Sequence, residues 1–553
     1  MKIALAQLNY HVGNFEANTQ KIISAIKEAQ QNGADLVVFA ELCISGYPAC
    51  DFLEFEEFIA LCEDSAKQIA EVCTDIACII GLPTINASPK GKDLYNSAYF
   101  IENGAIKTVV HKALLPNYDV FDEYRYFEPA DQFACIDFKG QKIALTICED
   151  LWNNIDNPIY KTFPMDVLIQ ENPDLMINIA ASPFAVNHDQ ERMQVLSYNA
   201  KKYALPLLYV NHVGAQTELI FDGGSMVYDA QGNLVDELDY FKEQLAYYNI
   251  KKTGVKEVSI QAEKPLTPDV SRMSKIEQIH QALILGIRDY FKKSGFSKAT
   301  LGLSGGIDSA LVCVLACEAL GAENVMAVLL PSAFSSDHSI KDAEDLVKNL
   351  GCMSQMVAIK SINQSFENAL EPQFAGLPFN IAEENIQSRS RAVILMAMCN
   401  KFGYILLNTS NKSEAAVGYG TLYGDMCGGI SVLGDVYKTQ VYELANHINR
   451  NGEIIPQNSI SKPPSAELRP GQKDSDSLPD YDILDQILKE YIENRKSSAA
   501  IIAAGFEEAV VRKVLRLVNI SEHKRYQTPP ILRVSAKAFG MGRRMPIVGK
   551  YLS

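Results

Sequence analysis

The sequence lacks long apolar runs, and we expect its start to be a strand rather than a hydrophobic leader. Its first ten residues, MKIALAQLNY, hold one lysine and a short apolar stretch that Gln7 and Asn9 interrupt. This pattern is typical of a first β-strand rather than a signal peptide. No apolar segment approaches the roughly 20 residues that cross a bilayer. We therefore expect no membrane partner and a cytoplasmic location.

Positive charge is also in short supply. The 553 residues include 51 Lys and Arg against 67 Asp and Glu, which gives a net charge of −16. Such an excess of negative charge disfavours nonspecific binding to nucleic acids or to anionic membranes. We therefore expect no nucleic-acid partner.

Cysteine pairs of the C-x-x-C type are absent, although the chain holds twelve cysteines. This absence argues against a zinc ribbon and against a dithiol redox motif. The cysteines are scattered and lie mostly in apolar settings, for example Cys313 and Cys317 in ALVCVLACEAL. In a cytoplasmic chain, we expect these thiols to stay reduced.

The length predicts at least two domains, because 553 residues are too many for one hydrophobic core. Strong periodic segments lapse between about residues 240 and 275, where two prolines precede a serine that can cap a helix. We place the boundary near residue 265, which gives domains of residues 1–262 and 263–553.

The two halves differ in their strand patterns. In the first half, eight short apolar segments are predicted as strands, which implies two sheets with helices outside them: residues 1–8, 35–41, 77–83, 97–104, 107–112, 142–150, 175–184 and 205–214. In the second half, strands at 298–305, 324–332, 354–360 and 403–410 alternate with helical stretches. This alternation predicts a doubly wound parallel sheet, whose ligands gather at the carboxyl ends of the strands.

Three predicted strands of the first half end in Glu41, Lys112 and Cys148. Taken singly, these would be a solvated acid, an edge lysine and a core thiol. Together, a lysine beside the thiol would favour the thiolate, and a glutamate could accept the thiol proton and later activate water. Glu149 and Asp150 follow Cys148, and their negative charge should make the thiol a weaker nucleophile. We expect both to face away from it, because successive strand residues point to opposite sides.

The segments FAELCISGYP, HKALLPNYDVFDEYRYF and TICEDLW around these residues resemble the nitrilase (carbon–nitrogen hydrolase) superfamily. The resemblance covers roughly residues 1–260 and implies a four-layer αββα sandwich. By this resemblance Cys148 forms a thioester with an amide carbonyl. Glu41 is then the general base, and Lys112 supports the tetrahedral oxyanion.

Within the amidase branch, the resemblance implies that Tyr118 and Ser182 bind the substrate amino acid, glutamine. Members often carry a lysine a few residues after the S-P-F of this region. Here the stretch reads SPFAVNHDQER, and His188 stands nearest to that position. His188 either replaces the lysine at the substrate carboxylate or is a surface histidine.

The segment LGLSGGIDSA at residues 301–310 follows a predicted strand and precedes a predicted helix. Clustered Ser and Gly at such a turn expose backbone N–H groups, and the helix N-terminus adds positive potential, so the turn can bind phosphate. The lysine of a Walker A loop is missing. The pattern S-G-G-x-D-S resembles instead the pyrophosphatase loop of amide-forming ligases. Those enzymes cleave ATP to AMP and pyrophosphate and activate a carboxylate for attack by ammonia.

Four more segments resemble NAD synthetases of the long, glutamine-dependent form: LLNTSNKSEAAVGYGTLYGDMCGG, LGDVYKTQVYELA, KPPSAELRPGQKDSDSLPDYDILDQIL and SEHKRYQTPP. With the nitrilase-like half in front, the likeness covers nearly the whole chain. It implies a Rossmann-like ATP-pyrophosphatase domain, a C–N ligase activity, and L-glutamine, ATP and deamido-NAD+ as substrates. It also implies a homo-oligomer. Because free ammonia would be mostly protonated and lost at neutral pH, fusing the two halves on one chain leads us to expect an enclosed passage for ammonia.

The resemblance carries over to individual residues. It implies that ATP contacts Gly302, Leu303, Ser304, Gly305, Gly306, Ile307, Asp308, Ser309, Thr409, Lys438 and Ser465. It implies that deamido-NAD+ contacts Asn385, Glu414, Asp425, His523 and Lys524. Asp308 and Glu414 would hold Mg²⁺, a hard cation that prefers oxygen ligands. Arg389 and Arg391, on a predicted helix, either belong to this site or form a solvated face.

Two alternatives remain at this point. The first is a ligase that uses the ammonia on another carboxylate, such as a xanthosine nucleotide or a cobyrinic-type acid, although such ligases usually pair with Cys–His–Glu glutaminases. The second is a nitrilase-like hydrolase whose second half is only a regulatory nucleotide-binding module. The intact S-G-G-x-D-S and N-K-S-E motifs argue against the second.

Overall fold

The chain forms two compact units, Met1–Arg272 and Met273–Ser553, in a computed structural model that describes residues 1–153, 159–252, 258–264 and 273–551. The boundary that we predict near residue 265 lies outside the described residues. Within those residues, each helix is too short or too polar to cross a membrane.

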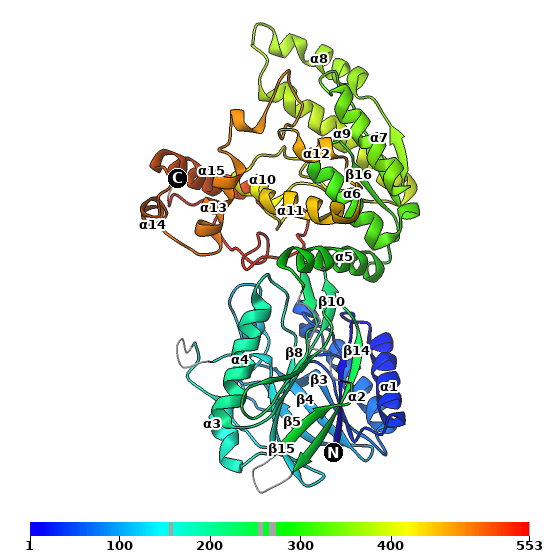
Figure 1. Cartoon of the computed structure of the whole chain (residues 1–553), viewed down its shortest axis with the longest axis vertical. Helices are drawn as coiled ribbons and strands as arrows, with labels where there is room; N and C mark the ends of the chain where they lie inside the picture. The colour runs from blue at the N-terminus through cyan, green and yellow to red at the C-terminus, as the bar shows by residue number, and fades with distance from the viewer. Residues whose placement is uncertain (154–158, 253–257, 265–272, 552–553) are drawn as a thin grey trace. The chain divides into compact units, whose positions relative to one another are not determined.

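The first unit is a sandwich of two sheets between helices (Figure 1). One sheet has the strand order β15-β14-β1-β2-β3-β4-β5, and the other has the order β13-β12-β9-β8-β7-β6. Helices α1 and α2 pack on the first sheet, and α3 and α4 pack on the second. This arrangement confirms the predicted four-layer αββα sandwich.

The strands of the first unit are β1 (Lys2–Gln7), β2 (Leu36–Val38), β3 (Ala77–Ile85), β4 (Leu94–Glu102), β5 (Ala105–His111), β6 (Ile136–Phe138), β7 (Gln141–Ile147), β8 (Leu175–Ala180), β9 (Leu207–Asn211), β10 (Val213–Gln216), β11 (Leu219–Asp222), β12 (Met226–Tyr228), β13 (Leu234–Glu237), β14 (Gln244–Lys252) and β15 (Val258–Ala262). Its α-helices are α1 (Phe15–Gln31), α2 (Glu56–Val72), α3 (Pro164–Leu168) and α4 (His188–Tyr203). Because both faces of each sheet are covered, central strands such as β8 are mostly apolar, and every residue of β8 is buried, the polar Asn178 included.

Three local expectations were wrong. The stretch after residue 240 contains two strands, since β14 pairs antiparallel with β1 and β15 pairs with β14. The strand expected at 354–360 is shorter, Met353–Met356. The strand expected at 142–150 stops at Ile147, and Cys148–Leu151 form a 3₁₀ turn. The alternation argument for the two acids after Cys148 therefore does not apply.

The second unit is built on a parallel sheet with the strand order β18-β17-β16-β19-β20. The chain adds β17 and β18 on one side of β16 and then returns to add β19 and β20 on the other. Right-handed crossovers therefore place α6 and α7 on one face and α9 on the opposite face. This topology confirms the predicted doubly wound sheet.

The strands of this unit are β16 (Ala299–Gly302), β17 (Val325–Leu329), β18 (Met353–Met356), β19 (Ile405–Asn408) and β20 (Ile430–Ser431). Its α-helices are α5 (Lys275–Lys293), α6 (Ile307–Leu320), α7 (Asp337–Leu350), α8 (Lys360–Phe374), α9 (Ile381–Phe402), α10 (Lys412–Val417), α11 (Lys438–Ile448), α12 (Gln457–Ser461), α13 (Tyr481–Ile492), α14 (Ser498–Ala503), α15 (Glu508–Ile520) and α16 (Glu522–Arg525). The strand order reverses between β16 and β19, where Thr300 lies beside Leu406. The loops that follow these two strands therefore open onto one crevice at the carboxyl edge.

Candidate active sites

Lys112 lies in a buried network of carboxylates in the first unit. Its Nζ is 2.6 Å from Glu41 Oε1 and 2.8 Å from Glu123 Oε2. The Asn96 amide donates to Glu41 (2.7 Å), and the Tyr47 hydroxyl donates to Glu123 (3.0 Å). Burial alone would lower the pKa of Lys112, but the charges of Glu123 and Glu41 outweigh it and raise the pKa well above its usual value. The ammonium therefore stays charged without access to water.

The Glu41 carboxylate is held at both oxygens. Oε1 accepts from Lys112 and Asn96, and Oε2 accepts from the backbone N–H of Ala181, 2.8 Å away, just after β8. Glu41 itself follows β2 by three residues. Strand ends from both sheets thus fix the position of this carboxylate.

Cys148 begins the turn that follows β7, in a left-handed backbone conformation with φ of +41°. Its side chain is buried. Burial and the charge of Glu41 raise the pKa of this thiol well above its usual value, and Lys112 acts in the opposite direction. A thiol that keeps its proton at rest needs a base during attack, and the Glu41 carboxylate is the group in this network suited to that role.

The two acids after Cys148 are engaged elsewhere. Asp150 Oδ1 accepts from the backbone N–H groups of Ala113 and Leu114 (3.0 and 2.9 Å), and its Oδ2 accepts from that of Ile147 (3.0 Å). Asp150 thereby ties the residues that follow Lys112 to the end of β7. Glu149 accepts hydrogen bonds from two tyrosine hydroxyls, those of Tyr118 (2.9 Å) and Tyr160 (3.0 Å).

The three residues expected to bind glutamine lie around this turn. Tyr118 is partly exposed and reaches Glu149, the neighbour of Cys148. Ser182 is buried, and its hydroxyl lies 3.4 Å from His188 Nε2. The His188 ring stacks on Trp152 at a centroid distance of 5.1 Å. His188 is therefore anchored beside Ser182 rather than free on the surface.

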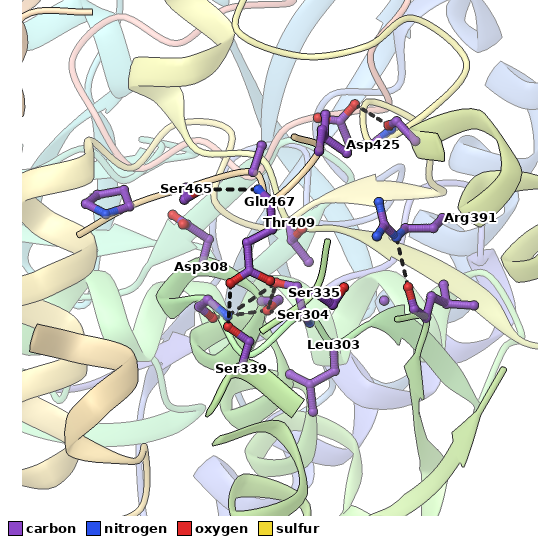
Figure 2. Close-up of a pocket in the computed structure, with 18 of the residues that line it drawn as sticks. Leu303, Ser304, Asp308, Ser335, Ser339, Arg391, Thr409, Asp425, Ser465 and Glu467 are labelled. Carbon is purple, nitrogen blue, oxygen red and sulfur yellow. Dashed lines mark hydrogen bonds between the residues drawn. The ribbon is translucent and has the colours of Figure 1, made fainter. Parts of the chain in front are cut away.

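A cavity of about 570 Å³ opens at the carboxyl edge of the second sheet (Figure 2). Ten of the eleven residues expected at ATP line it: Gly302, Leu303, Ser304, Gly306, Ile307, Asp308, Ser309, Thr409, Lys438 and Ser465. Glu414 and Asp425 line it as well, whereas Asn385, His523 and Lys524 are not among the lining residues.

Gly305 lies behind the cavity wall and shapes the S-G-G-x-D-S turn. Its φ is +80°, and a Cβ at this position would lie 2.1 Å from the backbone oxygen of Ser339. The hydroxyls of Ser304 and Ser309 are 3.1 Å apart, and Ser304 Oγ also accepts from the backbone N–H of Gly306 (3.3 Å). The turn leads into α6, so its shape and the helix N-terminus both favour an anion.

Asp308 accepts hydrogen bonds at both carboxylate oxygens on the charged side of the cavity. Its Oδ1 accepts from the Asn411 amide at 2.8 Å, and its Oδ2 accepts from the ammonium of Lys438. Burial and the charge of Asp308 raise the pKa of Glu414 well above its usual value. Two carboxylates that repel each other across a cavity fit a divalent cation. Within the described residues they belong to no tight group of three protein donors, so such a cation would take its other ligands from water and phosphate.

Two of the residues expected at deamido-NAD+ meet at Thr421. Its backbone N–H donates to Asp425 (2.7 Å), and its hydroxyl donates to Asn385 (2.7 Å). The Ser388 hydroxyl also donates to Asp425, at 2.9 Å. The loop before β20 and the start of α9 are thus joined by hydrogen bonds around the Asp425 carboxylate.

The other two lie on the short helix α16. Lys524 Nζ donates to the backbone oxygens of Gly418 and Gly420 (2.8 and 2.7 Å), in the segment between α10 and Asp425. His523 is exposed, and its Nδ1 lies 3.0 Å from the oxygen of Ile520.

Several site residues were missed from the sequence. Glu123 lies eleven residues after Lys112 in a segment that we matched as a whole, but nothing local marks it as the partner of Lys112. Glu467, in PPSAEL, accepts from the hydroxyls of Ser336 and Ser339, both at 2.8 Å, across more than 120 residues of sequence (Figure 2). Such pairings have no local signal.

The two arginines of α9 differ from each other. Arg391 lines the cavity, and its Nε donates to the backbone oxygen of Leu330 at 3.0 Å. Burial lowers the pKa of Arg391 to about 10. Arg389 is exposed, and its Nε donates to the oxygen of Leu422 at 3.1 Å. Arg389 therefore lies on a solvated face of α9, whereas Arg391 does not.

Comparison with known proteins identifies the family of each half of the chain. Residues 2–259 match the carbon–nitrogen hydrolase family, and residues 279–528 match the NAD synthase family. A glutamine-dependent NAD(+) synthetase of Synechocystis sp. is 48% identical over 557 residues, which cover 99% of this chain and 98% of the relative. The chain belongs to the glutamine-dependent NAD(+) synthetase family.

Other members of the glutamine-dependent NAD(+) synthetase family align over the same length. The enzyme of Acinetobacter baylyi is 42% identical, over 99% of this chain and 98% of the relative. The structure of the Acinetobacter baumannii enzyme in complex with adenosine diphosphate is 40% identical, with a TM-score of 0.77 over 99% of this chain and 98% of that one. The Cytophaga hutchinsonii enzyme, 23% identical with a TM-score of 0.81, shares the fold. Full-length membership in the glutamine-dependent NAD(+) synthetase family argues against both alternatives kept open above.

Proposed function

We propose that the chain converts deamido-NAD+ to NAD+ with ammonia that it releases from L-glutamine, while ATP is cleaved to AMP and pyrophosphate. The observation that carries this proposal is the presence on one chain of two complete sets of groups. The first is the Cys148 turn with its buried lysine and glutamate, and the second is the S-G-G-x-D-S cavity.

In the first unit, the thiol of Cys148 gives its proton to Glu41 as the sulfur attacks the side-chain amide carbon of glutamine. The charge that develops on the amide oxygen is stabilised by the ammonium of Lys112. Collapse expels ammonia, which takes the proton from Glu41, and leaves a thioester. Glu41 then accepts a proton from water as the water attacks the thioester, and it returns this proton to the Cys148 sulfur as glutamate leaves.

We assign glutamine binding to Tyr118, Ser182 and His188. The hydrogen bond of His188 to Ser182 and its stacking on Trp152 hold the imidazole at the mouth of the turn. A ring N–H of His188 can donate to the α-carboxylate of glutamine, so we assign His188 the place of the lysine that members of the family often carry.

In the second unit, the nicotinate carboxylate of deamido-NAD+ attacks the α-phosphorus of ATP, and pyrophosphate leaves. Ammonia then attacks the acyl carbon of the adenylate, AMP leaves, and the new amide loses a proton. The backbone N–H groups of residues 302–309 would bind the phosphates, with Thr409, Lys438 and Ser465 as further ATP contacts. Lys438 also offsets the charge of Asp308 as the polyphosphate enters.

We assign Mg²⁺ to Asp308 and Glu414. A bound Mg²⁺ would neutralise charge on the leaving pyrophosphate. Deamido-NAD+ would lie against Asn385, Glu414, Asp425, His523 and Lys524. The hydrogen bonds around Asp425, and those of Lys524 to the segment after α10, support this assignment because they hold these groups in one part of the unit.

We also propose that the enzyme is a cytoplasmic homo-oligomer. Large apolar side chains are exposed along α8, α9 and the segment between them: Phe366, Leu377, Phe379, Ile381, Val393 and Phe402. Val393 is 68% exposed, so Val393→Asp should leave the fold intact and weaken association. Light scattering tests both points: a monomer mass for the unmodified chain would contradict the homo-oligomer, and equal masses for the two chains would contradict an interface at Val393. The free thiols support a reducing compartment.

The decisive experiment compares nitrogen sources in Cys148→Ala. We expect glutamine-driven NAD+ formation to be lost, and ammonium-driven formation to stay within about twofold of the unmodified enzyme. Release of AMP and pyrophosphate should require deamido-NAD+. Cys62→Ala, another buried cysteine of the first unit, serves as the matched control and should retain both activities. Glutamine-driven synthesis in Cys148→Ala would contradict the proposal, and so would pyrophosphate release without deamido-NAD+.

A further inference from the structure

A cluster of three thiols lies in the second unit, among residues that the proposed reaction does not use. Cys313 and Cys317 occupy successive turns of α6, and Cys352 immediately precedes β18. No two of the three Sγ atoms are more than 4.8 Å apart. Cys313 and Cys352 are buried, Cys317 is partly exposed, and all three are free. Within the described part of the chain, no other three Cys, His, Asp or Glu side chains bring their ligand atoms so close together.

This spacing suits a shared metal ion. A zinc–sulfur bond is about 2.3 Å long, so sulfurs around one tetrahedral ion are about 3.8 Å apart. The three thiols would have to close by about 1 Å at most to reach that distance. A disulfide would need two of the sulfurs to approach to about 2 Å and would leave the third unused.

We propose that Cys313, Cys317 and Cys352 bind a thiophilic d¹⁰ cation such as Zn²⁺. The three thiols lose their protons as the ion binds. Water completes the tetrahedron on the exposed side of Cys317. Sulfur ligands select such ions over Mg²⁺, which prefers oxygen, so the site does not compete with the carboxylates of the cavity.

The site joins two segments that matter for the cavity. Cys352 lies 39 residues after Cys313 and 35 after Cys317, so the ion would connect α6 to the segment just after α7. The phosphate-binding turn leads into the same helix, α6. Asp308, in the first turn of α6, lies five residues before Cys313. Because the folded cluster offers three ligands at once and the unfolded chain does not, a bound ion stabilises the second unit. This consequence does not depend on the proposed reaction.

The test is cadmium binding to the full-length chain, with Cd²⁺ as a spectroscopic stand-in for Zn²⁺. The background variant is Cys148→Ser, because the catalytic thiol can itself bind metals. We expect one Cd²⁺ per chain with an ultraviolet thiolate-to-cadmium band, displaced by Zn²⁺, and a higher Tm with either ion. The band and the Tm shift should be lost in Cys352→Ser. They should persist in Cys399→Ser, which removes another buried cysteine of the same unit.

A second measurement covers the case in which Cys352→Ser does not fold. The unmodified chain is alkylated with and without Zn²⁺, and labelling at each cysteine is read by mass spectrometry. We expect Zn²⁺ to slow labelling of Cys313, Cys317 and Cys352 at least tenfold relative to Cys399. Equal labelling with and without Zn²⁺ overturns the proposal. A Cd²⁺ band of the same strength in Cys352→Ser, or no band at all, also overturns it.

Discussion

Asp150→Asn tests how the turn that begins at Cys148, Cys148–Leu151, is held in place. The substitution keeps the shape of the side chain but converts one oxygen to an NH₂ group. The carboxylate now accepts three backbone N–H groups, two on Oδ1 and one, from Ile147, on Oδ2. An amide oxygen can keep the first two bonds, but its NH₂ group faces the N–H of Ile147 and cannot accept from it.

The magnitudes separate stability from activity. An unpaired buried N–H costs about 1–3 kcal/mol. The weakening of the other two bonds on loss of charge is already contained in the pKa of Asp150, which those bonds lower. In the opposite direction, burial raises the pKa of Asp150 to about 6 from a reference of 3.8, so removing its charge returns about 3 kcal/mol at neutral pH. The two effects largely cancel in the free energy of unfolding. The repulsion at Ile147 remains, and it displaces the residue next to Cys148.

We therefore expect glutamine-driven NAD+ synthesis in Asp150→Asn to fall about 100-fold, which is the usual cost of misplacing a reacting group by about 1 Å. The Tm and ammonium-driven synthesis should change little. Asp174→Asn is the matched control, since Asp174 also accepts a backbone N–H, that of Lys142 (2.9 Å), at the opposite end of β7. Unchanged glutamine use in a folded Asp150→Asn enzyme would refute the reasoning. An equal loss in the control, or a parallel loss of ammonium-driven synthesis, would do the same.

Two further substitutions probe each site separately. Gly305→Ala places a Cβ against the backbone of Ser339 at a φ of +80°, so pyrophosphate release should fall at least tenfold while glutamate production from glutamine persists; normal pyrophosphate release would contradict this. Burial raises the pKa of Glu123 to about 7 from 4.5, so its contribution to stability is complete below pH 4.5 and is lost as the pH rises through 7. Urea unfolding of Glu123→Gln should therefore show a flatter pH dependence of the unfolding free energy across this interval, and an identical slope would argue against a raised pKa of the buried Glu123.

The chemistry of the glutaminase site could be predicted further than its geometry. Glu41, Lys112 and Cys148 were placed at strand ends because apolar runs mark strands and motif order marks the family. The hydrogen bonds of Asp150 to three backbone N–H groups were not predictable in this way. Its role depends on β7 ending at Ile147 and on a turn that brings a carboxylate back onto three N–H groups. This contact depends on tertiary structure, which the periodicity of a strand does not encode.

The second unit shows the same division. Alternating strands and helices were enough to predict the parallel sheet and the edge at which the phosphate-binding turn opens. In the first unit, the missed strands β14 and β15 carry little apolar signal, because many of their residues are only partly buried. The partners of Glu467 and the burial of Arg391 likewise depend on loops that are far apart in sequence. Partly exposed strands and long-range polar contacts are therefore the features that the sequence alone did not predict.

The N-K-S-E motif shows why a matched motif does not by itself identify functional residues. Its Lys412 is fully buried and pairs with Asp435 and Glu493, both at 2.9 Å, whereas Lys438 pairs with Asp308 at the wall of the cavity. Removing Lys412 leaves two carboxylates in the interior, so Lys412→Met should cost about 3–5 kcal/mol of stability. Lys438→Met leaves Asp308 beside a cavity that water can enter, so it should cost less stability and instead abolish pyrophosphate release. Circular-dichroism melts paired with a pyrophosphate assay separate the two. A stable but inactive Lys412→Met would show that this lysine acts on substrate after all, because loss of a purely internal ion pair would first be seen in the melt.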